Sequence, residues 1–223
     1  MIPWEHLDTA PIPGSSETLR LKRRGREYSI MLGTNELMNS RLSGSEEALA
    51  KLSIEKLGTK APHVLIGGLG MGFTLRAALD VLPAEATVTV AELVPAVVAW
   101  ARGPMAEVFA GCLDDPRVTV QEGDVGALIR ENAGLYDAIL LDVDNGPEGL
   151  SRPGNDGLYD PRGLQFAKAA LRAGGVLAVW SAAPDAGFTR RLHRAGFGVE
   201  EAKVKAHRGK SGTRHVIWLA VKG

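Results

Sequence analysis

The stretch HVLIGGLGMGFTLRAALDVL, residues 63–82, decides the fold of this 223-residue chain. It begins with a short apolar run typical of a buried strand, and it ends with the apolar spacing of a helix. Gly68, Gly70 and Gly72 lie between the two as G-x-G-x-G. Glycines permit a tight turn and let a ligand approach the backbone, beside the free N–H groups at the start of a helix. By itself, this pattern also fits a turn that only packs.

Strand and helix patterns continue to alternate after this stretch. Further strands are predicted at residues 87–93, 117–124, 136–142 and 175–182, and further helices at residues 95–102, 125–132, 161–174 and 185–196. Two last strands, at residues 198–207 and 214–222, are predicted to form a hairpin. Alternating strands and helices imply right-handed crossovers and a mostly parallel sheet. The sequence therefore predicts an α/β fold with a doubly wound, seven-stranded sheet of the methyltransferase-type Rossmann architecture.

The N-terminal residues 1–58 are predicted to form a small appendage to a nucleoside-binding domain at residues 59–223. The appendage is expected to contain an irregular segment, the two strands of a hairpin and one helix, at residues 1–17, 18–22, 27–32 and 43–58. The spacing of Ser43 and Glu46 fits a capping box at the start of the helix, and Gly58 fits its end.

Composition and charge favour a cytoplasmic protein without a nucleic-acid surface. Hydrophobic residues make up 45% of the chain, which is enough to bury a sizeable core. Lys plus Arg and Asp plus Glu number 26 each, and this balance argues against a surface built mainly for nucleic acid. The single cysteine, Cys112, excludes an internal disulfide and fits a reducing compartment. We expect no signal peptide and no membrane span, because no apolar run approaches about 18 residues.

Three acids are predicted at the ends of successive strands, where sheets of this kind bind ligands. Glu92 follows Gly72 by 20 residues, a spacing at which an acid can accept hydrogen bonds from both ribose hydroxyls of an adenosine. Asp124 can face an adenine amino group beside the backbone amide of Val125, or it can cap the helix that begins there. Asp142 ends the fourth strand. Three acids around one glycine-rich turn indicate a nucleoside site more specifically than any one of them.

Four segments together resemble the spermidine synthase family, within the class I S-adenosylmethionine-dependent transferases. They are VLIGGLGMGFTLRAAL (64–79), VAELVPAVVAWAR (90–102), DDPRVTVQEGD (114–124) and YDAILLDVDNGPEG (136–149). The resemblance implies that S-adenosylmethionine or its decarboxylated form is a co-substrate and that a small amine is the acceptor. It also implies a set of donor-binding residues, which are Gly68, Gly70, Met71, Gly72, Glu92, Asp124 and Val125.

The same resemblance implies that Asp142 serves the attacking amine. A sulfonium donor is attacked in line, so catalysis consists mainly of positioning and of control over the proton of the nucleophile. A carboxylate can attract the cationic amine, orient it and accept or relay its proton. Asp144 or Asn145 is expected to help orient the substrate, and Glu47 and Tyr159 are expected to contact it. Two alternatives stay open, in which Asp142 only caps the following loop and Tyr159 only anchors itself on the core.

The sequence departs from the family pattern at positions that affect specificity. The family has an Asp inside the glycine-rich turn, where it holds the amine of the aminopropyl donor, and this chain has Met71. The family's second acid after the fourth strand falls on Asn145, and Ser45-Glu46-Glu47 replaces a Tyr-His-Glu stretch that faces the polyamine. Methyl transfer therefore competes with aminopropyl transfer as a prediction, with S-adenosylmethionine bound at least as well as its decarboxylated form.

Two further classes of function stay open. Basic turns at residues 20–26 and 207–215 suggest an RNA methyltransferase, although such runs are usually solvated. A non-catalytic nucleoside-binding protein would keep the fold and lack the chemistry. The five histidines show no metal-ligand spacing, so we expect no metal. The sequence names neither the acceptor nor the oligomeric state, for which a homodimer is one option.

Overall fold

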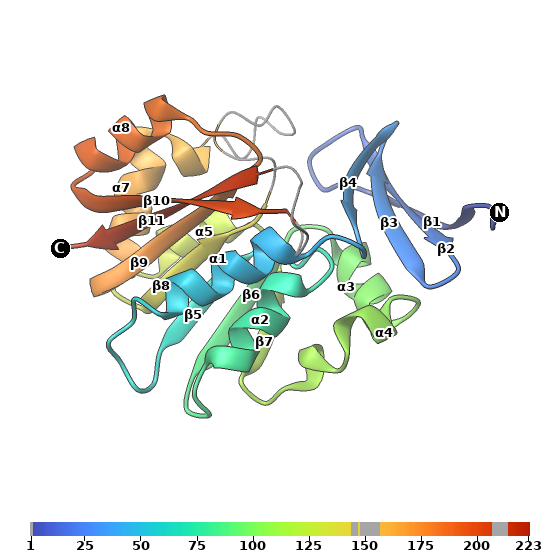
Figure 1. The fold of residues 1–223 in the computed structure, drawn as a ribbon, viewed down its shortest axis with the longest axis horizontal. Coiled ribbons are helices and arrows are strands. Elements are labelled where there is room, and N and C mark those ends of the chain that lie inside the picture. The colour runs from blue at the N-terminus through green and yellow to red at the C-terminus, as the bar shows by residue number, and fades with distance from the viewer. Residues whose placement is uncertain (1, 144–146, 148–156, 207–213) are drawn as a thin grey trace.

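A computed structural model of the chain describes residues 2–143, 147, 157–206 and 214–223. These residues form a large β-sheet and a smaller one near the N-terminus (Figure 1). The strands of the large sheet are β5 (His63–Gly67), β6 (Thr87–Glu92), β7 (Val118–Glu122), β8 (Tyr136–Leu141), β9 (Leu171–Ser181), β10 (Phe197–Lys205) and β11 (Arg214–Lys222). They lie in the order β10-β11-β9-β8-β5-β6-β7.

The large sheet confirms the predicted seven-stranded, doubly wound architecture. Strands β5 to β9 pair in parallel, and β11 joins antiparallel to both β9 and β10. The chain builds one half of the sheet from β5 to β7 and then returns to place β8 on the other side of β5. In sheets of this type, ligands bind outside the carboxyl ends of the strands at the point where the order reverses. We therefore expect a site beyond the ends of β5 and β8.

Helices cover both faces of the large sheet. They are α1 (Gly44–Ile54), α2 (Phe73–Val81), α3 (Pro95–Arg102), α4 (Ala106–Phe109), α5 (Val125–Glu131), α7 (Pro161–Ala170) and α8 (Ala186–Arg194). In β8, Ala138 and Leu140 pack with residues of α1, α2 and α3, whereas Ile139 and Leu141 pack with residues of α5, α7 and α8. Burial on both faces explains why β8 is apolar at nearly every position. None of the helices in the described ranges is long and apolar enough to cross a bilayer.

The small sheet contains four antiparallel strands, β1 (Glu5–Pro11), β2 (Thr18–Arg24), β3 (Glu27–Leu32) and β4 (Asn35–Asn39). The predictions for β2 and β3 are confirmed, but the expectation of an irregular segment at residues 1–17 is wrong, and β4 was not predicted. The backbone of β1 pairs with β2 from Glu5 opposite Arg23 to Pro11 opposite Thr18. Most residues of this edge strand are exposed, so no hydrophobic alternation marks it in the sequence.

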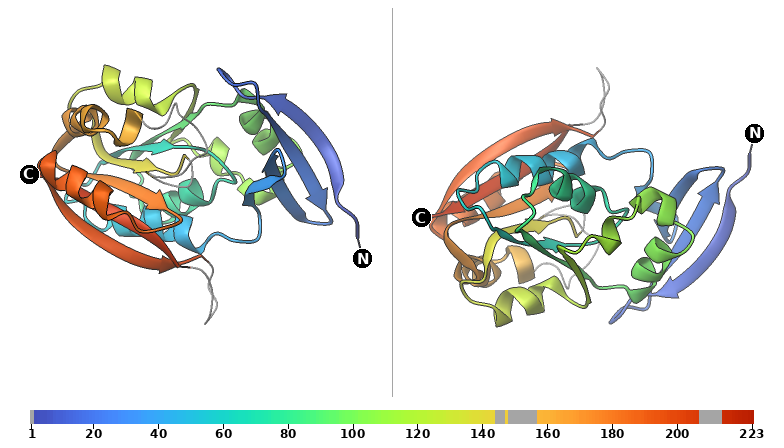
Figure 2. Two further views of the ribbon diagram at one scale, coloured as in Figure 1. Left: turned by 90° about the horizontal axis from the view of Figure 1, so that it is seen from above. Right: turned by 90° about the horizontal axis from the view of Figure 1, so that it is seen from below.

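Helix α1 begins at Gly44 and ends at Ile54, before the predicted stop at Gly58. The predicted capping box is wrong, because Ser43 donates its hydroxyl to Glu47 at 2.9 Å and no side chain caps the helix start. The helix packs against α2 and against β8 to β11 of the large sheet. The predicted domain boundary at residue 58 therefore groups α1 with the small sheet, although α1 packs on the large sheet. Figure 2 shows the small sheet at the end of the molecule opposite the C-terminus.

Strand β9 is longer than predicted. It begins at Leu171, directly after α7, whereas the sequence pattern predicts a helix up to residue 174. Leu171 pairs with Tyr136 of β8, and a register shift follows before Ala138 pairs with Val176. Pairing with β8 thus draws residues into the sheet that local spacing alone assigns to the helix.

Candidate active site

A cavity of about 290 Å³ opens at the carboxyl ends of β5, β6, β7 and β8. Glu92, Asp124 and Asp142, which lie at or just after the ends of β6, β7 and β8, all line it. Leu32 of β3 and Met38 of β4 line it from the small sheet. The three acids predicted at strand ends therefore meet at one cavity, which lies where the strand order reverses.

The glycine-rich turn forms part of the cavity wall. Gly68, Gly70 and Gly72 have φ values of +90°, +52° and +75°, a left-handed conformation that glycine adopts without strain. A Cβ at Gly68 would overlap the carbonyl oxygen of Asp142, and a Cβ at Gly72 would lie 2.6 Å from the ring of Phe109. The first two glycines line the cavity, while Gly72 faces Phe109 instead. Backbone conformation and close approach thus both require glycine here.

Glu92 is buried and braces this turn. Its Oε2 accepts a hydrogen bond from the backbone N–H of Leu69 at 2.9 Å, and its Oε1 accepts one from the N–H of Val94 at 2.9 Å. The carboxylate therefore ties the turn and the approach to α3 to the end of β6. A carboxylate can accept about four hydrogen bonds, so bracing the turn and binding a ribose are compatible roles.

Asp124 caps helix α5. Its carboxylate accepts hydrogen bonds from the N–H groups of Gly126 at 2.9 Å and Ala127 at 3.1 Å, and Arg130 lies 3.3 Å from it. The capping alternative is thus confirmed. Asp124 and Val125 also line the cavity, so a role toward adenine stays a prediction that the geometry allows.

Asp142 directly follows β8 and is held by two elements. Thr74, in the first turn of α2, donates its hydroxyl to Oδ2 of Asp142 at 2.8 Å. The backbone N–H of Asp142 donates to Gly67 at 3.0 Å, which extends the pairing of β8 with β5. The carboxylate therefore has a defined position at the cavity wall. Asp144 and Asn145, expected to help orient the substrate, lie outside the described residues.

Two methionines lie in or beside the glycine-rich turn. Met71 is 3% exposed and lines the cavity at the position where the family pattern has an acid. Met38 of β4 approaches from the small sheet, with its Sδ 3.2 Å from the place of a Cβ on Gly70. The side of the turn that faces the small sheet is therefore apolar.

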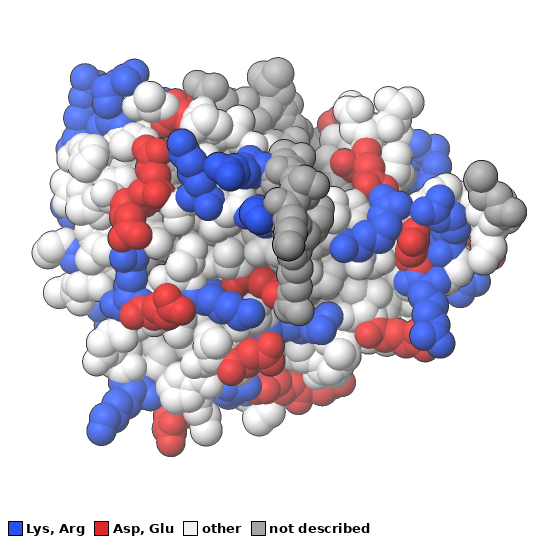
Figure 3. Space-filling model, in the orientation of Figure 1, with Lys and Arg blue, Asp and Glu red and all other residues white. Residues whose placement is uncertain are grey.

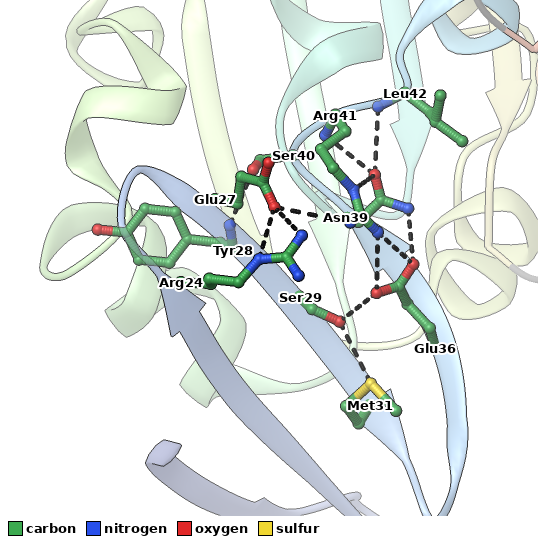
Figure 4. A network of polar contacts seen from close by, with 10 residues as sticks. All are labelled: Arg24, Glu27, Tyr28, Ser29, Met31, Glu36, Asn39, Ser40, Arg41 and Leu42. Carbon is green, nitrogen blue, oxygen red and sulfur yellow. Dashed lines mark hydrogen bonds and ion pairs between the residues drawn. The ribbon is translucent and has the colours of Figure 1, made fainter. Parts of the chain in front are cut away.

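A network of polar contacts holds β4 and the turn that follows it (Figure 4). Glu36 accepts hydrogen bonds from Ser29 at 2.7 Å and Asn39 at 2.8 Å, and it pairs with Arg41 at 3.2 Å. The Oδ1 atom of Asn39 accepts from the backbone N–H groups of Arg41 at 2.9 Å and Leu42 at 3.2 Å. The network fixes the connection between the small sheet and α1, which forms one side of the cavity.

Neither Glu47 nor Tyr159, both expected to contact the substrate, is among the residues that line the cavity. Glu47 accepts a hydrogen bond from the hydroxyl of Ser43 and lies 3.7 Å from Lys51, one turn further along α1. The ring of Tyr159 is buried and packs edge-on against Phe188, with 5.7 Å between ring centroids. Tyr159 therefore anchors itself on the core, as the alternative prediction stated.

The first turn of α1 instead contributes Ser45 and Glu46 to the cavity. Ser45 donates its hydroxyl to Oε2 of Glu46 at 2.8 Å, and Nδ1 of His215 in β11 lies 2.9 Å from the same hydroxyl. The ring of Trp180 packs edge-on against His215 at 4.7 Å, and both residues line the cavity. Sequence reasoning missed this cluster, because no local motif connects α1 with β11.

Burial shifts the pKa values of Glu46 and His215, and each shift favours the neutral form of the group. Desolvation raises the pKa of the Glu46 carboxyl, although the hydrogen bond from Ser45 opposes the shift. Desolvation also lowers the pKa of the His215 imidazole. Glu46 therefore binds a proton more readily than an exposed carboxylate does, and His215 loses its proton more readily than an exposed imidazole does.

The chain is similar in sequence to a known protein family and to two named proteins. A sequence profile of the spermine/spermidine synthase domain matches residues 44–185. A protein named polyamine aminopropyltransferase 2, from Pseudomonas aeruginosa, is 33% identical over 120 residues, which cover 52% of this chain and 32% of that protein. One named polyamine aminopropyltransferase 1, from Streptomyces coelicolor, is 41% identical over 87 residues, which cover 36% of this chain and 16% of that protein. The matched segments thus span a minor part of both relatives.

The whole described fold is also similar to a solved structure. The crystal structure of spermidine synthase from Thermotoga maritima matches with a TM-score of 0.77, over 98% of this chain and 73% of that chain. The sequence identity of this pair is 19%, so the likeness concerns the fold alone. It includes the small sheet, because the match covers nearly the entire chain.

Proposed function

Because the chain belongs to the spermine/spermidine synthase domain family, we propose that it transfers an aminopropyl group from decarboxylated S-adenosylmethionine to a small amine. The resemblance drawn from the four sequence segments is confirmed by the profile match. The observation that carries the proposal is that the glycine-rich turn, Glu92, Asp124 and Asp142 line one cavity. The names of the two partly matching relatives support the same class of reaction.

The donor would lie across the carboxyl ends of β5, β6 and β7. Glu92 would accept hydrogen bonds from the ribose hydroxyls, and Asp124 with the backbone of Val125 would face the adenine. The sulfonium centre would then be close to the glycine-rich turn and to Asp142, since Gly68 lies so near Asp142 that a Cβ on it would overlap the carbonyl oxygen of Asp142. The bond to be broken would then lie beside the carboxylate at the end of β8.

The reaction needs positioning and removal of one proton. In-line attack by the amine nitrogen forms a bond to the aminopropyl carbon and breaks the bond from that carbon to sulfur, which releases methylthioadenosine. The attacking amine is cationic at neutral pH and must lose a proton first. Asp142, held by Thr74 at the cavity wall, would attract this ammonium group and orient it toward the donor.

Incubation with decarboxylated S-adenosylmethionine and putrescine tests the proposed reaction. We expect methylthioadenosine and spermidine to form in equal amounts, measured by chromatography. Binding of methylthioadenosine without turnover of any of several small amines would instead favour the non-catalytic nucleoside-binding alternative.

Glu92→Ala is expected to weaken the binding of methylthioadenosine by about 1–3 kcal/mol, the scale for losing hydrogen bonds to a charged acceptor. Calorimetry on the purified variant measures this change, and circular dichroism checks its fold. Glu122→Ala is the matched control, because Glu122 pairs with Glu92 in register on β7 but is exposed and outside the cavity lining. Unchanged affinity in a folded Glu92→Ala variant would remove Glu92 from the site.

Met71→Asp is expected to raise the preference for the decarboxylated donor over S-adenosylmethionine by about tenfold. An acid at this position would pair with the terminal amine at about 1 kcal/mol, and it would also repel the carboxylate of the undecarboxylated donor. Met71→Asn is the matched control, since asparagine has nearly the same shape as aspartate but carries no charge. Competition binding of the two donors measures the preference. Equal preferences in both variants would show that the donor tail does not reach Met71.

The described surface gives little support to the RNA alternative. Arg23 and Arg24 of the basic turn pair with Glu5 at 2.9 Å and with Glu27 at 2.7 Å. Acidic and basic side chains are interspersed on the face that Figure 3 shows. Residues 207–213 of the second basic turn lie outside the described residues. The amine acceptor is therefore the better supported substrate.

A further inference from the structure

The contacts of Ser45 determine which nitrogen of His215 carries a proton. An ionised carboxylate can only accept hydrogen bonds, so Ser45 donates its one hydroxyl hydrogen to Oε2 of Glu46 at 2.8 Å. The same oxygen lies 2.9 Å from Nδ1 of His215 and must accept a hydrogen bond from it. A neutral imidazole with a proton on Nδ1 has its lone pair on Nε2. In this tautomer, Nε2 is the nitrogen of His215 that can accept a proton.

Among the described residues, the cationic side chains near His215 on β10, β11 and α1 either face away from it or are paired. Side chains alternate along β10 and β11, so His215 shares the α1 side of the sheet with Val204, its partner in register. The same alternation directs the flanking cations to the opposite face, and these are Lys203, Lys205 and Arg214.

Further charged groups on the α1 side of the described structure are two ion pairs and the acids of the cavity. On α1, Lys51 lies 3.7 Å from Glu47, and beyond the helix Lys56 lies 2.7 Å from Glu200. The neighbour from β9 is Trp180, which carries no charge. Asp142 is the cavity acid at the end of β8. A hydrogen-bonded path through Ser45 connects Glu46 to His215.

This inference rests on the proposed function. We propose that His215 removes the proton from the ammonium group of the acceptor and that Ser45 relays a proton from His215 to Glu46. The Nε2 atom of His215 takes the ammonium proton, Nδ1 gives its proton to the hydroxyl oxygen of Ser45, and Ser45 gives its own hydrogen to Oε2 of Glu46. The amine becomes neutral and can attack, His215 stays neutral, and Glu46 ends protonated. No further reactant is needed.

The cavity favours this transfer because the transfer neutralises two charged groups in a desolvated space. An ammonium ion and a carboxylate become a neutral amine and a neutral acid, and burial penalises the charged form of each. The raised pKa of Glu46 and the lowered pKa of His215 act in the same sense, since the proton ends on the carboxyl group and not on the imidazole. Asp142 then has a separate role, which is to attract and orient the amine.

The arrangement can be tested without any turnover. In spectra of the full chain labelled with ¹⁵N-histidine at pH 7, we expect His215 to be neutral with its proton on Nδ1. The His215→Gln variant identifies its signals among the five histidines. Ser45→Ala removes the acceptor and should abolish this preference. A wild-type His215 that is charged, or protonated at Nε2 alone, would overturn the proposal.

Kinetics of Glu46→Gln test the relay itself. Glutamine keeps an oxygen that can accept from Ser45, but it cannot take the proton. With decarboxylated S-adenosylmethionine and putrescine as probes, we expect kcat to fall by about ten- to a hundredfold with the KM for the donor nearly unchanged. The acidic limb of the kcat profile should move to lower pH, because loss of the negative charge of Glu46 makes His215 harder to protonate.

Glu200→Gln is the matched control, since Glu200 lies on the same side of the sheet, is paired with Lys56 and is outside the cavity lining. A merely structural role of Glu46 would lower kcat without moving the acidic limb, and that result, like an unchanged kcat, would overturn the relay. Failure of the proposed function would look different, because the wild type itself would release no methylthioadenosine from these probes.

Discussion

Turnover of the Asp142→Asn variant is expected to fall at least about a hundredfold, with donor affinity nearly unchanged. The amide has the shape of the carboxyl group and can still accept the hydrogen bond that Thr74 donates at 2.8 Å, so the side chain should keep its place. It lacks the negative charge that attracts and orients the ammonium group of the acceptor. Release of methylthioadenosine from decarboxylated S-adenosylmethionine and putrescine measures turnover, and calorimetry measures donor affinity.

Thr74→Val provides the comparison for this experiment. It removes the hydroxyl donor but leaves the carboxylate of Asp142 charged, so we expect a loss of about tenfold or less. A large loss in Asp142→Asn beside a small loss in Thr74→Val would assign the effect to the charge. Full activity in Asp142→Asn would mean that this carboxylate only caps the following loop and that the chemistry lies elsewhere.

Gly68→Ala is expected to lower the free energy of unfolding by about 3 kcal/mol or more and to abolish binding of methylthioadenosine. Its φ of +90° already disfavours a side chain, and a Cβ there would overlap the carbonyl oxygen of Asp142. Relief of this overlap requires the ends of β5 and β8 to move apart, and the cavity is built on these ends. Denaturant unfolding and calorimetry measure the two effects.

Gly134→Ala separates the backbone conformation from the close approach. Gly134 has a φ of +64°, but no atom lies within 4 Å of the place of its Cβ. We therefore expect a loss of about 1–2 kcal/mol, the cost of the left-handed conformation alone, with unchanged binding. Equal losses in the two variants would mean that the close approach of Gly68 to Asp142 adds nothing to the cost of the substitution.

The large sheet could be predicted because its signals are local. Continuous apolar runs such as β8 reflect burial on both faces, and short helices between them require right-handed crossovers. The glycine-rich turn and the acids Glu92, Asp124 and Asp142 could be placed together for a related reason. Parallel strands end at the same edge of a sheet, so residues at their carboxyl ends converge wherever they lie in the sequence.

The small sheet was predicted only in part, because pairing decides its outer strands. Strand β1 is mostly exposed and follows no alternating pattern, yet its backbone pairs with β2. Strand β4 has the sequence NELMN, which has little intrinsic preference for a strand and is held by pairing with β3 and by the polar network around Glu36. Neither cause is visible in local spacing.

The sequence by itself therefore determined the seven-stranded fold, the glycine-rich turn and the meeting of three acids at one edge of the sheet. Only the tertiary structure decided that Glu46, and not Glu47, reaches the cavity, because burial of Leu49 and Ala50 sets the rotation of α1. It also decided that Ser45 contacts His215 across 170 residues of sequence. Local patterns constrain residues within a few positions of one another, whereas this contact exists only after α1 has packed on the sheet that contains β11.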